Sequence, residues 1–226
     1  MLNKEQIEQN KSRYLELINS ITLEGANIKG FIDWLNRSDF FEAPASSKYH
    51  SNYAGGLCEH SLHVYDALVK LVEQFASHWV TEEFEPDENG NQLSSITLVK
   101  NYSEDSLKVV ALLHDISKTN FYEQYDRNVK DENGNWTKIK EYKTREVEDR
   151  FIYGSHEQNS EFMAHTFFPL SVEEASAILH HHGGMAWDSA QDDVSAIYDR
   201  FPLALLLHLA DMKATYLDEG HNESNN

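Results

Sequence analysis

The sequence contains a single cysteine, Cys58, and no apolar stretch long enough to form a membrane-spanning helix. One cysteine excludes a disulfide within the chain and fits a reducing compartment, while a spanning helix needs about 20 predominantly apolar residues. The first residues, Met1 to Gln6, also lack the apolar core of a secretion signal. We therefore expect a cytoplasmic protein with no membrane segment, in which Cys58 is a small buried side chain.

Basic residues are also scarce, because 19 lysines and arginines stand against 38 acidic residues and give a net charge of −19. The electrostatic field of this net charge repels polyanions, which argues against sequence-independent binding of long DNA or RNA. It does not exclude a small phosphorylated substrate, since divalent ions and one lysine can reverse the potential inside a cleft. The sequence has no P-loop, no dinucleotide-binding glycine motif and no nucleophile-elbow serine. Covalent catalysis through serine is therefore not expected.

Hydrophobic periodicity predicts a mostly α-helical protein. Apolar residues recur at helical spacing in several segments, and one of these segments begins with the capping pattern Ser171 to Glu174. The predicted helices cover 3–18, 27–36, 59–75, 103–115, 156–167, 171–181 and 202–217, and the predicted loops cover 40–56, 81–95 and 184–195. Between 119 and 144, aromatic and β-branched residues flank Asn133-Gly134, which predicts an inserted β-hairpin. We expect N-terminal helices in 1–45 to pack on a domain formed by 46–217, and a frayed tail at 218–226.

The most informative feature is the pair His114-Asp115, which ends the apolar run 109–113. A histidine and an aspartate that close a buried helix are costly to desolvate unless they bind a metal ion or relay a proton. Further histidines and aspartates occur in the order His60, His156, His180-His181-His182 and Asp211. Six side chains in this order predict a metal centre assembled from several helices.

The ordered set resembles the HD-domain superfamily of metal-dependent phosphohydrolases, helical proteins named for the His-Asp pair. The likeness covers about residues 50–217, with His-Asp-Ile-Ser-Lys at 114–118 where the family has H-D-I-G-K. The Gly-Gly-Leu-Cys-Glu-His segment at 55–60, the Gly-Ser-His step at 154–156 and the His-His-Gly step at 181–183 are most similar to the branch that contains 3′-5′ exoribonucleases. The resemblance implies an HD-type helical bundle with a hairpin insertion.

The resemblance also implies roles for individual residues. The implied metal ligands are His60, His114, Asp115, His156, His181 and Asp211. Asp115 would bridge two ions, the second of which is also held by His156 and His181. Lys118 matches the motif lysine and would orient a phosphate oxygen, so Asp115 and Lys118 are the expected catalytic residues. Imidazole-rich sites suit one or two ions of Mn, Fe, Co, Ni or Zn better than Mg, and such ions activate water for attack on phosphorus.

Some residues in these motifs have alternative interpretations. Ser117 stands where the family has glycine, and it is strained only if the backbone there needs a positive φ angle. Within the histidine triple, alignment on the following glycine favours His181 as the ligand, and His182 comes next. We expect His182 and His208 to contact substrate, since His208 lies one helical turn before Asp211 and both can face one cleft.

Two residues close to His60 in the sequence, Glu59 and His63, are expected to have supporting roles. Glu59 is expected to form a hydrogen bond with a histidine or, alternatively, to act as a proton carrier. His63 is expected to pack against the site or to support it from outside. We expect His50, like His78, His165 and His221, to be a surface or packing residue.

These observations predict a nucleotidase or phosphodiesterase that cleaves a nucleotide or a short oligonucleotide. The likeness favours exonucleolytic trimming of 3′ ends of RNA or DNA, whereas the acidic net charge opposes binding of a polymer. Two alternatives come from other classes, a di-iron oxygenase of the same fold and a non-catalytic nucleotide-binding module. The oligomeric state is left open, a homodimer included.

Overall fold

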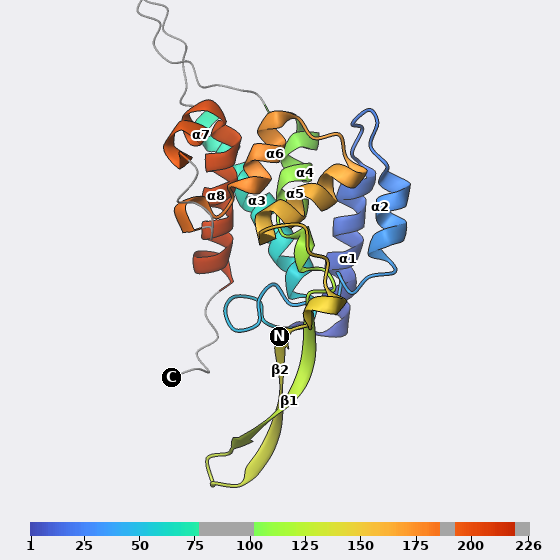
Figure 1. Cartoon of the computed structure of the whole chain (residues 1–226), viewed down its shortest axis with the longest axis vertical. Helices are drawn as coiled ribbons and strands as arrows, with labels where there is room; N and C mark the ends of the chain where they lie inside the picture. The colour runs from blue at the N-terminus through green and yellow to red at the C-terminus, as the bar shows by residue number, and fades with distance from the viewer. Residues whose placement is uncertain (77–101, 186–192, 220–226) are drawn as a thin grey trace, which may run out of the picture.

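The computed structural model describes residues 1–76, 102–185 and 193–219. Within these ranges the chain forms a bundle of helices from which one β-hairpin projects (Figure 1). The helices are α1 (Lys4–Asn19), α2 (Ile28–Leu35), α3 (Gly56–Ala76), α4 (Glu104–Leu113), α5 (His156–Phe167), α6 (Val172–Leu179), α7 (Val194–Arg200) and α8 (Pro202–Lys213). The expectation of a mainly helical protein with an inserted hairpin is confirmed.

Side-chain caps fix the starts of the two helices that border the histidine-rich motifs. The Ser155 side chain accepts a hydrogen bond from the backbone N–H of Gln158, and Gln158 Oε1 accepts one from the backbone N–H of Ser155. This capping box makes His156 the first residue of α5. The predicted capping box at Ser171 is present too, with Glu174 as its partner. These caps satisfy backbone N–H groups that otherwise have no partner in a first helical turn.

The core lies where α3 packs against both α4 and α8. Its fully or almost fully buried leucines are Leu57, Leu62 and Leu68 of α3, Leu112 and Leu113 of α4, and Leu203 and Leu207 of α8. Burial of each such side chain contributes about 1.5–3 kcal/mol before the entropy cost of ordering. Because the polar motif residues lie on these helices or at their ends, packing of the leucines brings them together in the interior.

Tyr14 attaches α1 to this core. Its hydroxyl donates a hydrogen bond to the carbonyl oxygen of Leu112 at 2.8 Å, and its ring packs against Phe40 and Phe41. Tyr14→Phe keeps the ring and leaves that carbonyl without its donor, so we expect a loss of about 1–2 kcal/mol in the free energy of unfolding, measured by denaturant titration. The exposed Tyr153 is the control, and Tyr153→Phe should change stability by less than about 0.5 kcal/mol. Equal stability of the two variants would contradict the role of the bond.

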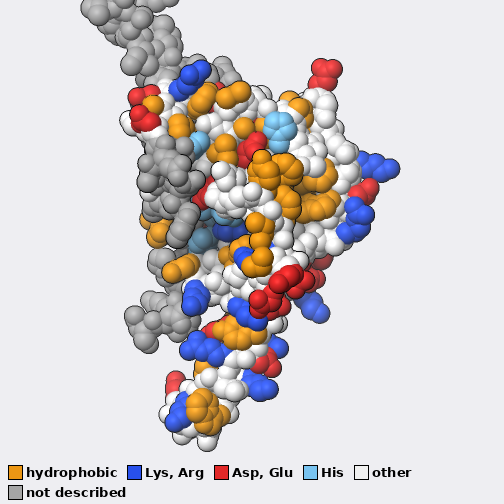
Figure 2. All heavy atoms as spheres, in the orientation of Figure 1, with side chains coloured by type: hydrophobic (Ala, Val, Ile, Leu, Met, Phe, Trp, Pro, Cys, Tyr) orange, Lys and Arg blue, Asp and Glu red, His pale blue; other side chains and the backbone are white. Residues whose placement is uncertain are grey.

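The hairpin consists of β1 (Tyr122–Lys130) and β2 (Trp136–Thr144), paired antiparallel from Tyr122 opposite Thr144 to Lys130 opposite Trp136. Its five-residue loop differs from a two-residue Asn-Gly turn, because Asp131 accepts the backbone N–H groups of Asn133 and Asn135. Gly134 adopts a φ of 79°, which explains the glycine. Basic, acidic and apolar side chains alternate over its surface in Figure 2. The hairpin is thus confirmed within 119–144, and it projects away from the helices (Figure 1).

Several local boundaries differ from the sequence interpretation. The last α-helix, α8, ends at Lys213, and a π-helical turn over Ala214–Asp218 replaces its predicted continuation to 217. Helix α7 was not predicted, since its seven residues are too few for a periodic signal; Asp193 caps its start. The predicted turn in 81–95 and the chain end beyond 219 lie outside the described residues. Among the helices of the described ranges, none has the length and hydropathy to cross a bilayer.

Candidate metal centre

The structure brings together all six side chains that the motifs single out. His60 lies in the second turn of α3, Asp211 on α8 and His156 at the start of α5, while His114-Asp115 follows α4 and His181 follows α6. Five segments therefore contribute to one cluster. The residues that form its possible metal-binding groups include His60, His114, Asp115, His156, His181 and Asp211.

Asp115 occupies the centre of this cluster. Its Oδ2 lies 3.6 Å from both His60 Nε2 and His114 Nε2. Its Oδ1 faces the other side, 2.5 Å from His156 Nε2 and 3.6 Å from His181 Nε2. Each carboxylate oxygen thus has its own pair of imidazoles, and these residues would be able to hold one or two metal ions.

Backbone carbonyls set the tautomers of two histidines. His114 Nδ1 donates to the carbonyl oxygen of Ala111 at 2.8 Å, and His181 Nδ1 donates to that of Ile178 at 2.7 Å. Their Nε2 atoms consequently keep a lone pair in the neutral ring. His181 Nε2 is buried without a hydrogen-bond partner. A buried polar atom of this kind is costly unless a cation is bound, so the donor set fits a metal ion.

The electrostatics around His60 also favour a positive charge in the cluster. His60 Nε2 lies 3.2 Å from Asp211 Oδ1 and 3.2 Å from His114 Nε2. Burial opposes the imidazolium of His60, but Glu219 and Asp211 outweigh it and raise its pKa to about 10. Burial instead lowers the pKa of His114 to about 3, despite the nearby carboxylates. The carboxylates around His60 therefore favour a positive charge here, which protonation of His60 or a bound metal ion would supply.

Ser117 orients His156 and carries no backbone strain. It lies in a short 3₁₀ turn, Ile116–Lys118, and it is absent from the described non-glycine residues with positive φ. Ser117 Oγ lies 2.6 Å from His156 Nδ1 and accepts a hydrogen bond from Ser160 Oγ at 3.0 Å. The serine that replaces the family's glycine thus fixes the imidazole ring whose Nε2 faces Asp115, a role that the sequence interpretation missed.

Lys118 supplies the positive charge beside Asp115. Its Nζ lies 2.5 Å from Asp115 Oδ2, and its side chain is 12% exposed. Burial would raise the pKa of Asp115, but Lys118 and the surrounding histidines hold it well below its usual range. The carboxylate is therefore ionised, as a metal ligand must be.

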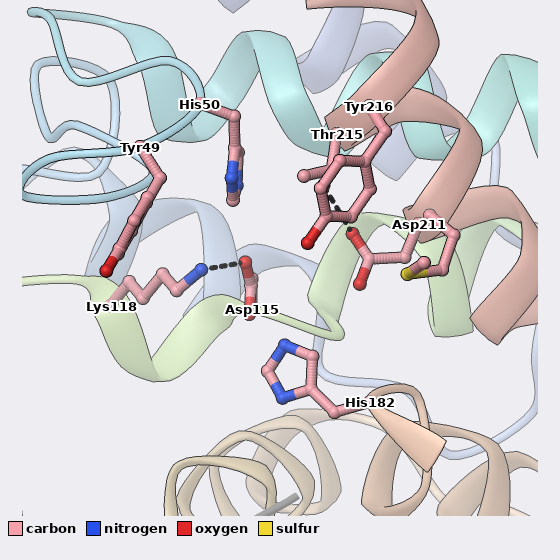
Figure 3. Close-up of a pocket in the computed structure, with 9 residues that line it drawn as sticks. Tyr49, His50, Asp115, Lys118, His182, Asp211, Thr215 and Tyr216 are labelled. Atoms are coloured by element: carbon pink, nitrogen blue, oxygen red, sulfur yellow. Dashed lines mark hydrogen bonds and ion pairs between the residues drawn. The ribbon is translucent and has the colours of Figure 1, made fainter. Parts of the chain in front are cut away.

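A cavity of about 220 Å³ opens beside this pair (Figure 3). The residues that line it are Tyr49, His50, Asp115, Lys118, His182, Asp211, Met212, Thr215 and Tyr216. Asp115 and Lys118 lie together at its base, while Tyr49 and Tyr216 come from opposite sides. The two tyrosines are 70% and 51% exposed, so their rings form part of the mouth.

The two histidines predicted to contact substrate differ in position. His182 lines the cavity, and its Nδ1 lies 2.6 Å from Glu157 Oε1. His208 is not among the lining residues; its Nδ1 donates to the backbone carbonyl of His181 at 2.7 Å, and its ring stacks on Tyr198. His208 thus supports the backbone of a predicted ligand and does not face the cavity.

Two residues at the site were given other roles by the sequence interpretation. His50 was expected to be a surface or packing residue, yet it lines the cavity and its ring lies 4.7 Å from that of His60. Burial lowers its pKa to about 4, so the ring is neutral at physiological pH. Glu219, assigned to the tail, has a fully buried side chain that contacts His60 and His63. Neither residue lies in a motif, so the sequence contains no sign that the folded chain brings them to the site.

Two neighbours of His60 in the sequence show how helical position separates their roles. Glu59 accepts a hydrogen bond from the hydroxyl of Tyr53 at 2.6 Å, so its expected bond to a histidine is replaced by one to a tyrosine. Cys58 is 2% exposed, as expected of a small buried side chain. Adjacent residues on a helix point in different directions, so only His60 of these three faces the cluster.

Comparison with known proteins identifies the family. No curated protein and no solved structure matches the chain. The family model described as HD domain matches residues 57–214, a range that contains all six clustered residues. HD domains bind divalent metals and are generally metal-dependent hydrolases, and the His/Asp groups of this structure are suited to hold an ion. The match extends over more than half of the chain, which therefore belongs to the HD domain family.

Proposed function

We propose that this protein is a metal-dependent phosphohydrolase that cleaves a phosphoester bond in a nucleotide or a short oligonucleotide. The observation that supports this most directly is the position of Asp115. Four imidazoles surround its carboxylate, and Lys118 lies beside it at the base of a small cavity. Asp115 and Asp211, two of the candidate metal ligands, line the same small cavity as the Lys118 ammonium group, which supports the proposal.

The residues divide into two sets of ligands around Asp115. His60, His114, Asp115 and Asp211 would hold one ion, and Asp115, His156 and His181 would hold the other. Divalent transition-metal ions bound there supply Lewis acidity, which activates water and neutralises charge on the phosphoryl oxygens. The histidine-rich donor set favours Mn, Fe, Co, Ni or Zn over Mg.

Lys118 would bind and orient the phosphate. Burial disfavours its ammonium form, but the adjacent Asp115 outweighs this and raises the pKa of Lys118. The side chain therefore stays charged at physiological pH and presents N–H donors to a phosphoryl oxygen at the cavity base. His182 lines the same cavity with its ring held by Glu157, which suits a second contact to substrate.

The cavity favours a small substrate with a planar group. A space of about 220 Å³ is below the usual size of sites that enclose drug-sized ligands. A phosphate and its sugar would occupy it, and a base would lie at the mouth between Tyr49 and Tyr216, because bases stack on aromatic side chains. The net charge of −19 opposes a long strand. A nucleotide therefore ranks before a polymer, and 3′-5′ exonuclease activity is the second candidate.

One experiment separates these functions. Protein purified without chelator is analysed for metal, and mononucleotides, dinucleotides and a labelled single strand are then compared at low salt with that metal. We expect about two transition-metal equivalents and faster turnover of the short substrates. Progressive trimming of the strand would instead establish an exonuclease, and oxygen uptake by the iron-loaded protein would establish an oxygenase. Nucleotide binding without turnover under Mn, Fe, Co, Ni, Zn and Mg would establish a binding module and overturn the proposal.

A further inference from the structure

We infer that Glu219 is a positioning residue of the metal centre: it orients His60 toward Asp115 and Asp211, and it fixes the loop that brings His50 to the cavity. The inference rests on the proposed metal-dependent function. It concerns a residue beyond the family match, which ends at 214.

The carboxylate of Glu219 is buried and is held in one position by three hydrogen bonds. Its side chain is 0% exposed, and Oε1 accepts hydrogen bonds from His60 Nδ1 at 2.9 Å and from His63 Nδ1 at 3.1 Å. Its Oε2 accepts a hydrogen bond from Ser51 Oγ at 2.7 Å. A buried carboxylate needs several donors to offset its desolvation, and here three side chains from two other segments supply them.

The bond to His60 decides which nitrogen faces the cluster. Because Glu219 occupies Nδ1, the Nε2 atom of His60 is the one directed at Asp211 and Asp115. The corresponding partners of His114 and His181 are neutral backbone carbonyls, and the partner of His156 is a serine hydroxyl. A carboxylate partner raises the basicity of a ligating imidazole more than a neutral one does. His60 is therefore the ligand that gains most from its outer partner.

The bond to Ser51 extends this role to the cavity wall. Ser51 has a φ of 44°, a left-handed conformation that is unfavourable for a non-glycine residue. The hydroxyl of Ser51 donates to Glu219, and the N–H of Ala45 donates to the carbonyl oxygen of Ser51 at 3.0 Å. Tyr49 and His50, which directly precede Ser51, line the cavity. One carboxylate thus links a predicted ligand to the loop that shapes the substrate site.

The C-terminal turn explains how Glu219 reaches this position. Helix α8 places Asp211 in the cluster and then widens into the π-helical turn Ala214–Asp218. The N–H of Glu219 closes this turn by donating to the carbonyl of Ala214 at 3.0 Å. The same segment therefore contributes two carboxylates, Asp211 directly to the cluster and Glu219 behind His60.

The test is a titration of Mn²⁺ into the metal-free protein, measured by calorimetry. Glu219→Gln keeps the size and one acceptor oxygen but removes the charge, and we expect it to weaken one binding event by about 10- to 100-fold while the other changes by less than about threefold. Glu219→Ala should weaken the same event at least as much. Glu59→Gln, one residue from His60 but bonded to Tyr53, is the matched control and should bind as the wild type does.

A double-mutant cycle and a tautomer measurement exclude a merely structural role. In a His60→Ala background, Glu219→Ala should have no further effect on Mn²⁺ affinity, because its effect passes through that ring. Ring ¹⁵N spectra of the metal-free protein should shift for His60 and His63 in Glu219→Gln and stay unchanged for His114. If Glu219→Ala does not fold, Glu219→Gln decides the outcome.

The possible outcomes separate this inference from the proposed function. A wild-type protein that takes up no Mn²⁺, Co²⁺ or Zn²⁺ overturns the function itself. A wild-type protein that binds ions, with both Glu219 variants binding them as tightly, overturns the positioning role alone. Additive losses in the His60→Ala background would do the same.

Discussion

Replacing Asp115 with asparagine is expected to remove both metal ions and to lower kcat/KM by at least about 1000-fold. Removing a single hydrogen-bond donor to a transition state already costs about 10²–10³ in rate. Asp115 has one oxygen within 3.6 Å of His60 and His114 and the other within 3.6 Å of His156 and His181. Asparagine keeps the shape but offers only one acceptor oxygen and no charge, so neither set of ligands is complete.

Metal content by plasma mass spectrometry, beside turnover of the best substrate, checks this result. Asp66→Asn is the matched control, because Asp66 pairs with Arg13 on the surface at 2.5 Å and has no contact with the cluster. It should retain the wild-type ions and rate, since exposed ion pairs contribute little to stability. An Asp115→Asn protein that keeps about two equivalents of metal and its activity would refute the central role of Asp115.

The six clustered residues are predictable from sequence because their ordered motifs resemble the HD-domain pattern. Helical periodicity places most of these motifs on helices or at helix ends, but it does not say which groups meet; the resemblance supplies that. Within the histidine triple, both His181 and His182 offer a ligand atom to a possible metal-binding group with Asp115 and His156. His181 is fully buried and faces Asp115, whereas His182 lines the cavity and His180 Nδ1 donates to the carbonyl of Ser176.

The supporting residues are not predictable in this way. Glu219, His50 and Ser117 reach the site through a π-helical turn, a loop with a left-handed residue and a 3₁₀ turn. The elements of Glu219 and His50 have no hydrophobic period and no motif spacing, and Ser117 lies inside the 114–118 motif but differs from the glycine of the family. Local sequence therefore contains no signal for the directions of these side chains. Helix α7 was missed for a related reason, since seven residues cover barely two turns. The sequence thus predicts the groups that would bind metal but not the groups that orient them.

Lys118 provides a second large effect that differs in kind from that of Asp115. Lys118→Met keeps most of the apolar stem and removes the charge that lies 2.5 Å from Asp115 Oδ2. Loss of a cation aimed at the phosphoryl group should lower kcat by about 10²–10³. Metal binding should persist, because Lys118 is not a ligand and its removal makes the cluster more negative.

The contrast between kcat and metal content is the informative measurement. We expect Lys118→Met to contain the wild-type amount of metal and to bind Mn²⁺ at least as tightly, while Lys118→Arg recovers part of the lost rate because it restores the charge with a different geometry. Lys143→Met is the control, since Lys143 pairs with Glu123 on the exposed surface of the hairpin. Loss of metal in Lys118→Met would show that the lysine maintains the cluster and does not act on substrate. Full activity of Lys118→Met would exclude Lys118 from phosphate binding. Binding of the phosphate would then depend on the metal ions held around Asp115.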